Sequence, residues 1–301
     1  MKLGFIGLGK MGGAMVRRLH NAGHEVVAVD KDPVALEEAK NHNITVCPSI
    51  EEAIGLLPLP RILWVMTPPG NATEQVISTL KPLLGEGDIV VDGGNSDFRD
   101  TLRRGRSLGE KGIIFVDAGV SGGTQGAREG CGLLVGANEQ VFANLSPLFE
   151  ALAAKGAWAR VGNSAAGHFT KAVHNGVEYA LMQAYGEGYE LLAASDIEVD
   201  VLATMEAWQN GCSIRSHLLE KLIEALTPDV SLKGVKGYAA DSGMGRWTVE
   251  EAIRLRVPTP TISAALQARF RSQQDDSPTI KSIAALRGVI GGHAVKKSEE
   301  K

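Results

Sequence analysis

The chain begins with a short apolar run that leads directly into a glycine-rich turn. Residues Leu3–Gly7 are expected to form a strand, which is followed by Gly7-Leu8-Gly9-Lys10-Met11-Gly12. The next residues place Met15, Val16 and Leu19 at helical spacing. A G-x-G-x-x-G turn between a strand and a helix lets the backbone approach a pyrophosphate, which the free N–H groups of the helix N-terminus then bind. The sequence therefore predicts a doubly wound α/β domain that binds a dinucleotide.

A second apolar run supplies the residue expected to read the ribose of the cofactor. Residues Glu25–Asp30 predict a strand, and the carboxylate of Asp30 comes eighteen residues after Gly12. A carboxylate at this place accepts hydrogen bonds from both ribose hydroxyls and repels a 2′-phosphate. We therefore expect NAD as the cofactor, with NADP also accepted to the extent that Lys31 offsets the repulsion.

Short β-rich runs alternate with helical patterns up to residue 162 and then stop. The expected strands are Leu3–Gly7, Glu25–Asp30, Arg61–Met66, Asp88–Asp92, Ile113–Asp117, Gly132–Gly136 and Trp158–Gly162. Apolar strands that alternate with helices are typical of a parallel sheet covered on both faces. Residues 1–162 are therefore predicted to form an NAD(P)-binding Rossmann domain.

Residues 163–301 are predicted to form an all-α C-terminal domain. Their periodic segments cover residues 164–194, 198–210, 213–226, 247–256, 259–272 and 278–291. No stretch rich in glycine and serine separates the two parts, so we expect a continuous long helix at the join.

Composition excludes several classes of protein. The 301 residues carry 31 basic and 35 acidic side chains, and this balance argues against nucleic acid or an anionic membrane as a partner. Cys47, Cys131 and Cys212 are widely spaced without a CxxC pair, so we expect buried or half-buried thiols and no metal site. No signal peptide or membrane span is recognisable, which predicts a cytoplasmic protein.

Two further turns follow strands of the predicted sheet. Thr67-Pro68-Pro69-Gly70 comes after a run that ends in Met66, and Gly93-Gly94-Asn95 comes after Asp88–Asp92. Ligands of open α/β sheets lie beyond the carboxyl ends of the strands. The residues expected to contact the cofactor here are Met66, Thr67, Pro68 and Asn95. Turn chemistry alone explains Thr67–Gly70 equally well as a plain loop.

A third glycine-rich turn follows the strand predicted at Ile113–Asp117. It reads Gly119-Val120-Ser121-Gly122-Gly123. Its backbone N–H groups and the hydroxyl of Ser121 are suited to holding a carboxylate.

The long helix carries a polar stripe where an apolar seam is usual. Lys171, His174, Asn175 and Glu178 lie at positions i, i+3, i+4 and i+7 and therefore share one face. The stripe is either an exposed, ion-paired face or the lining of a polar cavity. Gly176 favours the second interpretation, because a glycine within a helix costs roughly 1 kcal/mol relative to alanine and indicates that something packs closely against the backbone.

Together these segments resemble the short form of the decarboxylating 6-phosphogluconate dehydrogenases, within the β-hydroxyacid dehydrogenase superfamily. The matching pieces are Gly7–Gly12, Asp92–Asn95, Phe115–Gly123, Lys171–Tyr179, Gly245–Thr248, Ala268–Arg269 and Arg287 with His293. The long form has an additional stretch of helical domain that this chain lacks. The resemblance implies roles in the pentose phosphate pathway and gluconate metabolism, and it assigns substrate binding and oligomerisation to residues 163–301.

The resemblance also implies how the substrate reacts. Lys171 would be the general base that takes the proton of the C3 hydroxyl, and Glu178 would be the general acid that protonates C1 after CO2 is lost. A base must be neutral at the working pH, and an acid must be protonated, so both would need shifted pKa values. The residues implied to hold the hydroxyls and the C1 carboxylate are Asn95, His174, Asn175, Ser121, Gly122 and Gly123.

The 6-phosphate of the substrate would be held by Tyr179, Arg269 and Arg287, and the further substrate-binding residue His293 follows Arg287 in the sequence. In the family the equivalents of the last two come from the neighbouring subunit, so a homodimer or homotetramer is implied. The sequence departs from the family at Ser242 and Met244, where a lysine and a threonine usually hold the phosphate. Arg246 or Lys236 are candidates to compensate.

Two alternatives remain open from the sequence. One is a β-hydroxyacid dehydrogenase of the 3-hydroxyisobutyrate type, whose helix typically reads Lys-x-x-Asn-Asn rather than Lys171-x-x-His174-Asn175 with Glu178 after it. The other is a non-catalytic NAD(P)-binding sensor, against which the intact pair of Lys171 and Glu178 argues.

Overall fold

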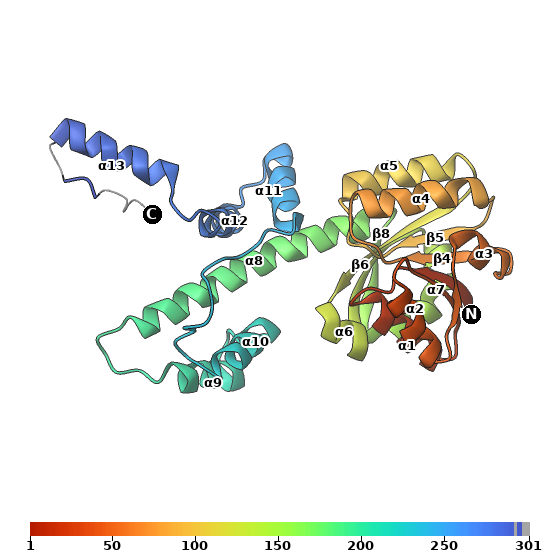
Figure 1. The fold of residues 1–301 in the computed structure, drawn as a ribbon, viewed down its shortest axis with the longest axis horizontal. Coiled ribbons are helices and arrows are strands. Elements are labelled where there is room, and N and C mark those ends of the chain that lie inside the picture. The colour runs from red at the N-terminus through yellow and green to blue at the C-terminus, as the bar shows by residue number, and fades with distance from the viewer. Residues whose placement is uncertain (292–293, 297–301) are drawn as a thin grey trace. The chain divides into compact units, whose positions relative to one another are not determined.

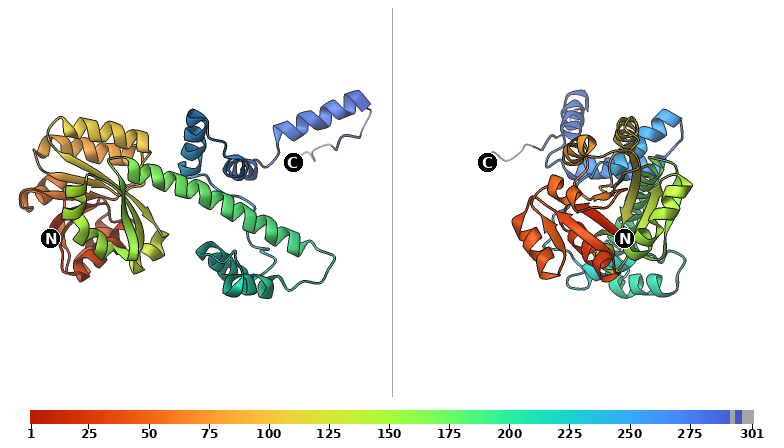
Figure 2. Two further views of the ribbon diagram at one scale, coloured as in Figure 1. Left: turned by 180° about the vertical axis from the view of Figure 1, so that it is seen from behind. Right: turned by 90° about the vertical axis from the view of Figure 1, so that its right-hand side faces the viewer.

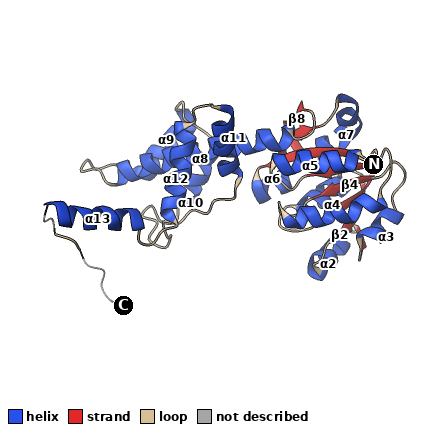
Figure 3. Ribbon diagram, turned by 90° about the horizontal axis from the view of Figure 1, so that it is seen from above, coloured by secondary structure: helices blue, strands red, loops and turns tan. Residues whose placement is uncertain are grey.

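The computed structural model describes residues 1–291 and 294–296. It contains two compact units, Met1–His174 and Asn175–Lys301. Every described strand lies in the first unit, whereas the described part of the second unit is built from helices and loops (Figure 3). The predicted fold class, a Rossmann-type domain followed by an all-α part, is confirmed.

The first unit contains one eight-stranded sheet. Its strands are β1 (Lys2–Ile6), β2 (Glu25–Val29), β3 (Thr45–Cys47), β4 (Ile62–Val65), β5 (Ile89–Asp92), β6 (Ile114–Ser121), β7 (Cys131–Gly136) and β8 (Ala153–Gly162). Their order across the sheet is β3-β2-β1-β4-β5-β6-β7-β8. Neighbouring strands are parallel except β6 and β7, which run antiparallel, so the sheet is mixed.

The register of the strands brings the predicted turns to one edge. Ile6 pairs with Val29 and with Val65, and Val65 in turn pairs with Asp92. The turns after β1, β2, β4 and β5 therefore begin side by side at the carboxyl edge of the sheet. This edge is where ligands of open α/β sheets bind.

Helices cover both faces of the sheet (Figures 1 and 2). The helices of the first unit are α1 (Gly12–Asn21), α2 (Pro33–Asn41), α3 (Ile50–Gly55), α4 (Asn71–Leu83), α5 (Phe98–Gly109), α6 (Gly123–Glu129) and α7 (Glu139–Leu152). α1, α6 and α7 contribute to a core around Phe5 and Trp64, and α3, α4 and α5 contribute to a core around Val65 and Val90 on the other face. Burial on both faces explains why the strands read as unbroken apolar runs.

One helix, α8 (Ala166–Ala193), begins in the first unit and continues into the second. The continuous helix predicted over 164–194 is thus present. The other helices of the second unit are α9 (Val201–Gly211), α10 (His217–Leu226), α11 (Met244–Leu255), α12 (Pro260–Ser272) and α13 (Pro278–Gly291). Small apolar cores form around Met205 with Leu219 and around Tyr179 with Leu266. Within the described ranges, no helix is long and apolar enough to cross a lipid bilayer.

Several expectations were wrong in detail. The sheet was expected to be parallel, but β6 and β7 are antiparallel, and the strand expected at Trp158–Gly162 already begins at Ala153. The strand that was expected to end at Asp117 continues to Ser121, because Gly119 pairs with Leu134 of β7 instead of turning. Strand β3 was not predicted, since it has only three residues and the first of them is exposed. Cys47 and Cys131 are buried as expected, but Cys212 is exposed.

Candidate active site

The glycine turn after β1 has the geometry that a phosphate-binding turn requires. Gly7 has a φ of +102°, and a Cβ atom there would lie 2.5 Å from the carbonyl oxygen of Met66. A Cβ atom on Gly12 would lie 2.0 Å from the carbonyl oxygen of Gly7. At Gly9 a Cβ atom would meet nothing within 4 Å, so its backbone is open to a ligand. Only glycine fits the first and third positions, and the second leaves space for a pyrophosphate.

Asp30, directly after β2, is held in place by the same turn. Its carboxylate accepts hydrogen bonds from the backbone N–H of Leu8 and, at 2.8 Å, from that of Asp32. A carboxylate has about four acceptor positions, so these two bonds orient it and leave further positions for ribose hydroxyls. Asp32 itself caps α2 by accepting from the N–H of Val34 at 2.9 Å.

A cleft of about 620 Å³ opens between these turns. Its lining includes seven of the residues predicted to bind the cofactor, which are Gly7, Gly9, Asp30, Lys31, Met66, Thr67 and Pro68. Leu8 and Lys10 line a smaller adjacent hollow of about 260 Å³, and Met11 is the N-cap of α1. A cleft of this size is within the ordinary range for small-molecule sites.

The far wall of the cleft was missed by sequence reasoning. Pro48, Ser49, Ile50 and Glu51 contribute it, at the start of α3. The signal that could have found it is the capping pair Ser49 and Glu52, because the Ser49 hydroxyl accepts from the N–H of Glu52 at 3.2 Å. That helix start follows the unpredicted strand β3 on the sheet next to β2.

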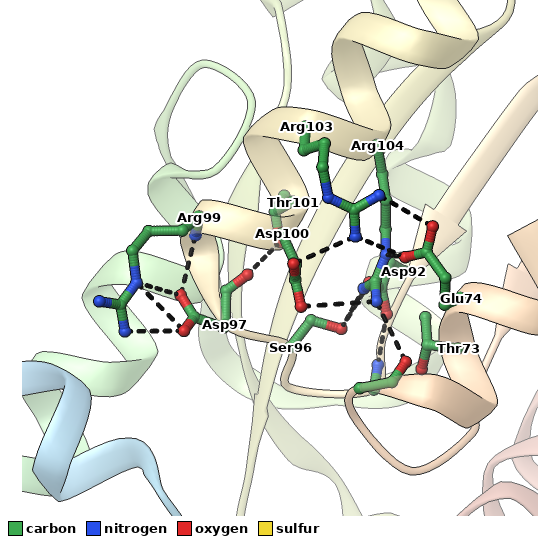
Figure 4. A network of polar contacts seen from close by, with 12 residues as sticks. Thr73, Glu74, Asp92, Ser96, Asp97, Arg99, Asp100, Thr101, Arg103 and Arg104 are labelled. Carbon is green, nitrogen blue, oxygen red and sulfur yellow. Dashed lines mark hydrogen bonds and ion pairs between the residues drawn. The ribbon is translucent and has the colours of Figure 1, made fainter.

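A buried arginine joins the two turns after β4 and β5. Arg104 of α5 donates to the carbonyl oxygen of Gly70 at 3.2 Å, to Ser96 Oγ at 3.0 Å and to Glu74 Oε2 at 2.9 Å. It also forms an ion pair with Asp92 at 3.4 Å, and its side chain is 1% exposed (Figure 4). One guanidinium therefore fixes both turns, a link over more than thirty residues of sequence that no local pattern indicated.

Glu74 of α4 completes this network (Figure 4). Its carboxylate accepts from Arg103 at 2.8 and 2.6 Å as well as from Arg104. The hydrogen bonds from Arg103, supported by Arg104, outweigh partial burial and lower the pKa of Glu74 to about 2. The carboxylate thus stays charged and keeps both arginines in place.

Asn95 ties the turn after β5 to the neighbouring strand. Its φ is +54°, and its carboxamide donates to the carbonyl oxygen of Val120 at 3.0 Å and accepts from the N–H of Val120 at 2.8 Å. These bonds use one N–H and one acceptor position of the carboxamide, so one N–H and one lone pair remain for a ligand.

The predicted base Lys171 lies against β6. Its side chain is buried, and Nζ donates to Ser121 Oγ at 3.0 Å and is 3.3 Å from Nδ1 of His174. A Cβ atom on Gly119 would lie 2.5 Å from the Cβ of Lys171, so the helix packs directly on the strand. Gly122 and Gly123 then turn the chain into α6, with φ values of +107° and +58°. The structure thus brings together Lys171, His174 and the segment expected to hold a carboxylate.

In the second unit, the predicted phosphate ligands Tyr179 and Arg269 lie together. The guanidinium carbon of Arg269 is 3.5 Å from the ring centre of Tyr179. The Tyr179 hydroxyl is 3.2 Å from a carboxylate oxygen of Asp241 and 3.3 Å from Ser242 Oγ. The two positions that depart from the family pattern are thus Ser242, which contacts the Tyr179 hydroxyl, and Met244, which is the first residue of α11.

Of the two candidates to compensate, Arg246 is linked to this group through Asp241. It forms an ion pair with Asp241, whereas Lys236 pairs with Asp275 at 3.1 Å. Burial alone would raise the pKa of Asp241, but hydrogen bonds from Arg246 and from the N–H of Gly243 lower it below its ordinary value. Arg246 is thus linked through one carboxylate to the hydroxyl of Tyr179.

The polar stripe on α8 has the close neighbour that Gly176 indicated. A Cβ atom on Gly176 would lie 2.8 Å from Cγ2 of Thr248, so α11 packs directly on this part of the helix. Asn175 is buried and Glu178 is half-buried. Arg287 is exposed on α13, and His293 lies outside the described residues. Among the described residues, no group of three or more histidine, cysteine or acidic side chains is arranged to hold a metal ion.

Two family models match the chain and together span nearly all of it. Residues 2–162 match the NAD binding domain of 6-phosphogluconate dehydrogenase, and residues 167–299 match the 6-phosphogluconate dehydrogenase C-terminal domain. The chain belongs to the 6-phosphogluconate dehydrogenase family.

Individual members of this family are similar over the whole chain. The NAD(+)-dependent, decarboxylating 6-phosphogluconate dehydrogenase of Haloferax volcanii is 40% identical over 302 residues, which cover 100% of both chains. The decarboxylating enzyme of Lactococcus lactis subsp. lactis is 35% identical over 99% of this chain but only 66% of its own length. The chain is thus a short-form member of the 6-phosphogluconate dehydrogenases.

A solved structure of the family shares the fold. Plasmodium falciparum 6-phosphogluconate dehydrogenase, which was studied with NADP+ and with 6-phosphogluconate, has a TM-score of 0.83 and 26% identity. The match covers 100% of this chain and 67% of that one.

Proposed function

We propose that the chain oxidises and decarboxylates 6-phospho-D-gluconate to D-ribulose 5-phosphate and CO2 with NAD+. The observation that carries the proposal is the buried Lys171, whose Nζ is 3.0 Å from Ser121 Oγ at the carboxyl edge of a dinucleotide-binding sheet. A base beside a carboxylate-binding segment and a nicotinamide site is what oxidation of a 3-hydroxy acid requires. The 40% identity to an NAD(+)-dependent, decarboxylating relative over full length supports the same activity.

In this proposal the proton transfers belong to α8. Lys171 takes the proton of the C3 hydroxyl, while Ser121 and His174 hold its amine in place. NAD+, when bound in the cleft lined by Gly7, Gly9 and Asp30, supplies the acceptor for the hydride of C3. The resulting β-keto acid loses its carboxylate as CO2.

Glu178 then acts as the acid that the enediol needs. It is two helical turns after Lys171 on the unbroken helix α8, and it protonates C1 to give the ketose phosphate. A 3-hydroxyisobutyrate-type dehydrogenase forms no enediol and has no use for this acid. The remaining substrate contacts proposed are those of Asn95, Gly122, Gly123 and Asn175.

The preference for NAD+ is proposed to rest on two carboxylates after β2. Asp30 is fixed by the N–H groups of Leu8 and Asp32, and the carboxylate of Asp32 is fixed at the start of α2. A 2′-phosphate would approach both negative charges, whereas ribose hydroxyls can donate to Asp30. Lys31 also lines the cleft and allows some use of NADP+.

The 6-phosphate site is proposed to need a second copy of the chain. Tyr179 and Arg269 form one half, and Arg287 with His293 would come from the neighbouring subunit of a homodimer or homotetramer. α13, which carries Arg287, has no buried residue and exposes a row of apolar side chains, which are Ile280, Ile283, Leu286, Val289 and Ile290. A helix with such a face is stabilised by covering it with another surface.

Initial rates test the proposal. The absorbance of reduced nicotinamide is followed with NAD+ or NADP+ and with 6-phospho-D-gluconate, unphosphorylated gluconate or 3-hydroxyisobutyrate. We expect turnover with the phosphorylated substrate and a higher rate with NAD+. Binding of NAD+ without any reduction would favour a sensor, and turnover of 3-hydroxyisobutyrate alone would favour the other dehydrogenase class.

A further inference from the structure

Asp117 is a buried carboxylate in the sheet of the first unit, and the proposed chemistry assigns it no role. It lies in β6 and its side chain is fully buried. Oδ1 accepts from the N–H of Ala165 at 2.6 Å, and Oδ2 accepts from the N–H of His168 at 2.8 Å. Ala165 directly precedes α8, and His168 lies in its first turn, where the N–H groups have no partner within the helix. Asp117 therefore caps α8 although it lies almost fifty residues before it.

The backbone at this point adopts a conformation that needs such a restraint. Ala165 has a φ of +74°, in the left-handed region that costs a residue with a side chain roughly 1–2 kcal/mol. Residues in sparsely populated conformations persist where the surrounding contacts fix them. The hydrogen bond from the Ala165 N–H to Asp117 is one of those contacts.

Two glycines make room for the carboxylate. A Cβ atom on Gly136, which pairs directly with Asp117 in β7, would lie 2.3 Å from Oδ1. A Cβ atom on Gly167 would lie 2.4 Å from the carbonyl oxygen of Leu134 and 2.7 Å from that of Asp117. The start of α8 is thus pressed onto β6 and β7 around this one side chain.

The same face of β6 carries the groups that meet Lys171. Residues 117, 119 and 121 of a strand point to one side because side chains alternate along it. On that side Asp117 holds His168, Gly119 packs on the Cβ of Lys171, and Ser121 accepts from Lys171 Nζ. His168 precedes Lys171 by three residues, so the two residues lie near the same face of α8 and both face β6.

We propose that Asp117 is a positioning residue for Lys171. It fixes the register of α8 on β6, and this register sets where the amine of Lys171 lies relative to Ser121. The inference rests on the proposed function for its meaning in catalysis, but the register itself is testable without substrate.

The surroundings of the Asp117 carboxylate disfavour its charged form, which is consistent with a role that depends on its hydrogen bonds and not on its charge. Burial raises the pKa of Asp117, and the neighbouring carboxylate of Asp92 acts in the same direction, while His168 and the two N–H donors act against it. The His168 ring is buried as well, with Nδ1 2.7 Å from Thr101 Oγ1. A buried carboxylate is costly, so its two directed hydrogen bonds are its evident contribution.

The test compares Asp117→Asn with a matched control, Asp88→Asn. Asp88 is also a buried aspartate and also accepts from two backbone N–H groups, those of Arg61 at 2.7 Å and Gly85 at 3.0 Å. It lies just before β5, at the opposite edge of the sheet from the candidate site. Both variants should lose stability, but only one should disturb Lys171.

We expect Asp117→Asn to lower kcat by about 10- to 100-fold with little change in the KM for NAD+, because a displaced base affects the chemical step and not the cofactor cleft. Asp88→Asn should keep kcat within about twofold. Equal losses of kcat in the two variants, or wild-type kcat in a folded Asp117→Asn, would overturn the inference.

A second measurement needs no substrate. In protein labelled with carbon-13 lysine, the Cε signal of Lys171 is identified by its loss in Lys171→Arg and followed through a pH titration. Asp117→Asn should move the signal and its titration midpoint, and Asp88→Asn should leave both unchanged. If the wild type does not turn over 6-phospho-D-gluconate, the proposed function fails while this measurement still decides the register.

Gly136→Ala covers the case in which Asp117→Asn does not fold. Its added Cβ pushes on Oδ1 of Asp117 without removing the carboxylate. The Lys171 signal should shift in this variant and kcat should fall. A folded Gly136→Ala with the wild-type signal and kcat would contradict the inference.

Discussion

The two units of the chain bury their apolar side chains to very different degrees. In the first unit, large residues such as Trp64 and Phe149 are fully buried between the sheet and its helices. In the second unit, α13 has no buried residue, and Val289 and Ile290 are 87% and 78% exposed. The first unit thus obtains its stability from its own core, whereas the second presents surface that a protein normally covers.

The two units also differ in the functions proposed for their residues. The groups proposed to bind the dinucleotide and to remove the proton, such as Asp30 and Lys171, lie in the self-contained unit. Tyr179, Arg269 and Arg287, proposed for the phosphate, lie in the unit with exposed apolar helices. We infer that substrate binding, but not cofactor binding, depends on assembly.

The largest expected effect tests the first unit alone. Lys171→Ala should lower kcat by about 10³-fold, because it removes the proposed base, while NAD+ still binds to the glycine turn. Reduced nicotinamide is measured for the rate and calorimetry for the binding. Lys40→Ala, which removes an exposed lysine paired with Glu37, is the control and should keep full activity. Retained turnover in Lys171→Ala would rule out the assigned role.

Glu178→Gln should separate the two proton transfers. Hydride transfer should persist, while protonation of the enediol at C1 becomes slower by about 10²-fold. Exchange of solvent deuterium into C1 of the product reports this step. Wild-type exchange in the variant would remove Glu178 from the mechanism.

A charge on the apolar face of α13 tests whether the second unit depends on assembly. Ile283→Asp should dissociate the oligomer, with a rise of about 30-fold or more in the dissociation constant, because a charge would have to be buried in an apolar contact. Analytical ultracentrifugation measures the change, and the KM for 6-phospho-D-gluconate should rise with it. Lys281→Asp introduces the same side chain on the other side of α13, where none of the five apolar residues is three or four positions away, and serves as the control. Equal assembly of the two variants would show that this face is not an interface.

Asp30→Ala should narrow the preference for NAD+ over NADP+ by about tenfold, because it removes the charged acceptor of the ribose hydroxyls. The ratio of kcat/KM for the two cofactors is the measurement. An unchanged ratio would mean that Asp30 does not read the ribose.

The smallest effect concerns the stability of the first unit at low pH. The folded state lowers the pKa of Glu74 from 4.5 to about 2, so its charged form stabilises the fold above pH 4.5 and this contribution is lost as the pH falls towards 2. Glu74→Gln should therefore cost about 1 kcal/mol at neutral pH, a modest figure because the carboxylate is partly exposed and screened. Urea unfolding at several pH values should show the difference from wild type shrinking through this window. A difference that is independent of pH would contradict the assignment.

Sequence patterns predicted what depends on local order. The apolar runs located β1, β2, β4 and β5, and the glycine spacing located the turn at Gly7, because burial on both faces and a required backbone conformation leave direct traces in the sequence. They did not predict that β6 continues beyond Asp117, since whether Gly119 turns or pairs depends on its partner in β7.

The sequence predicted those features of the site that depend on spacing within one helix or turn, but not the contacts between residues far apart in the chain. Lys171 and His174 could be placed on one helical face, but the contact of Lys171 with Ser121 joins residues fifty positions apart. The roles of Arg104 and Asp117 are of the same kind, because each binds backbone groups far away in the chain. Periodicity holds no information on such pairs.

The single guanidinium of Arg104 has a consequence for how substitutions in this chain combine. Because the loop at Gly70 and the turn at Ser96 share it, substitutions in one are transmitted to the other, and their effects should not add in a double-mutant cycle. In a redesign of these turns, the two segments should therefore be varied together, because a change in one alters the support that Arg104 gives to the other.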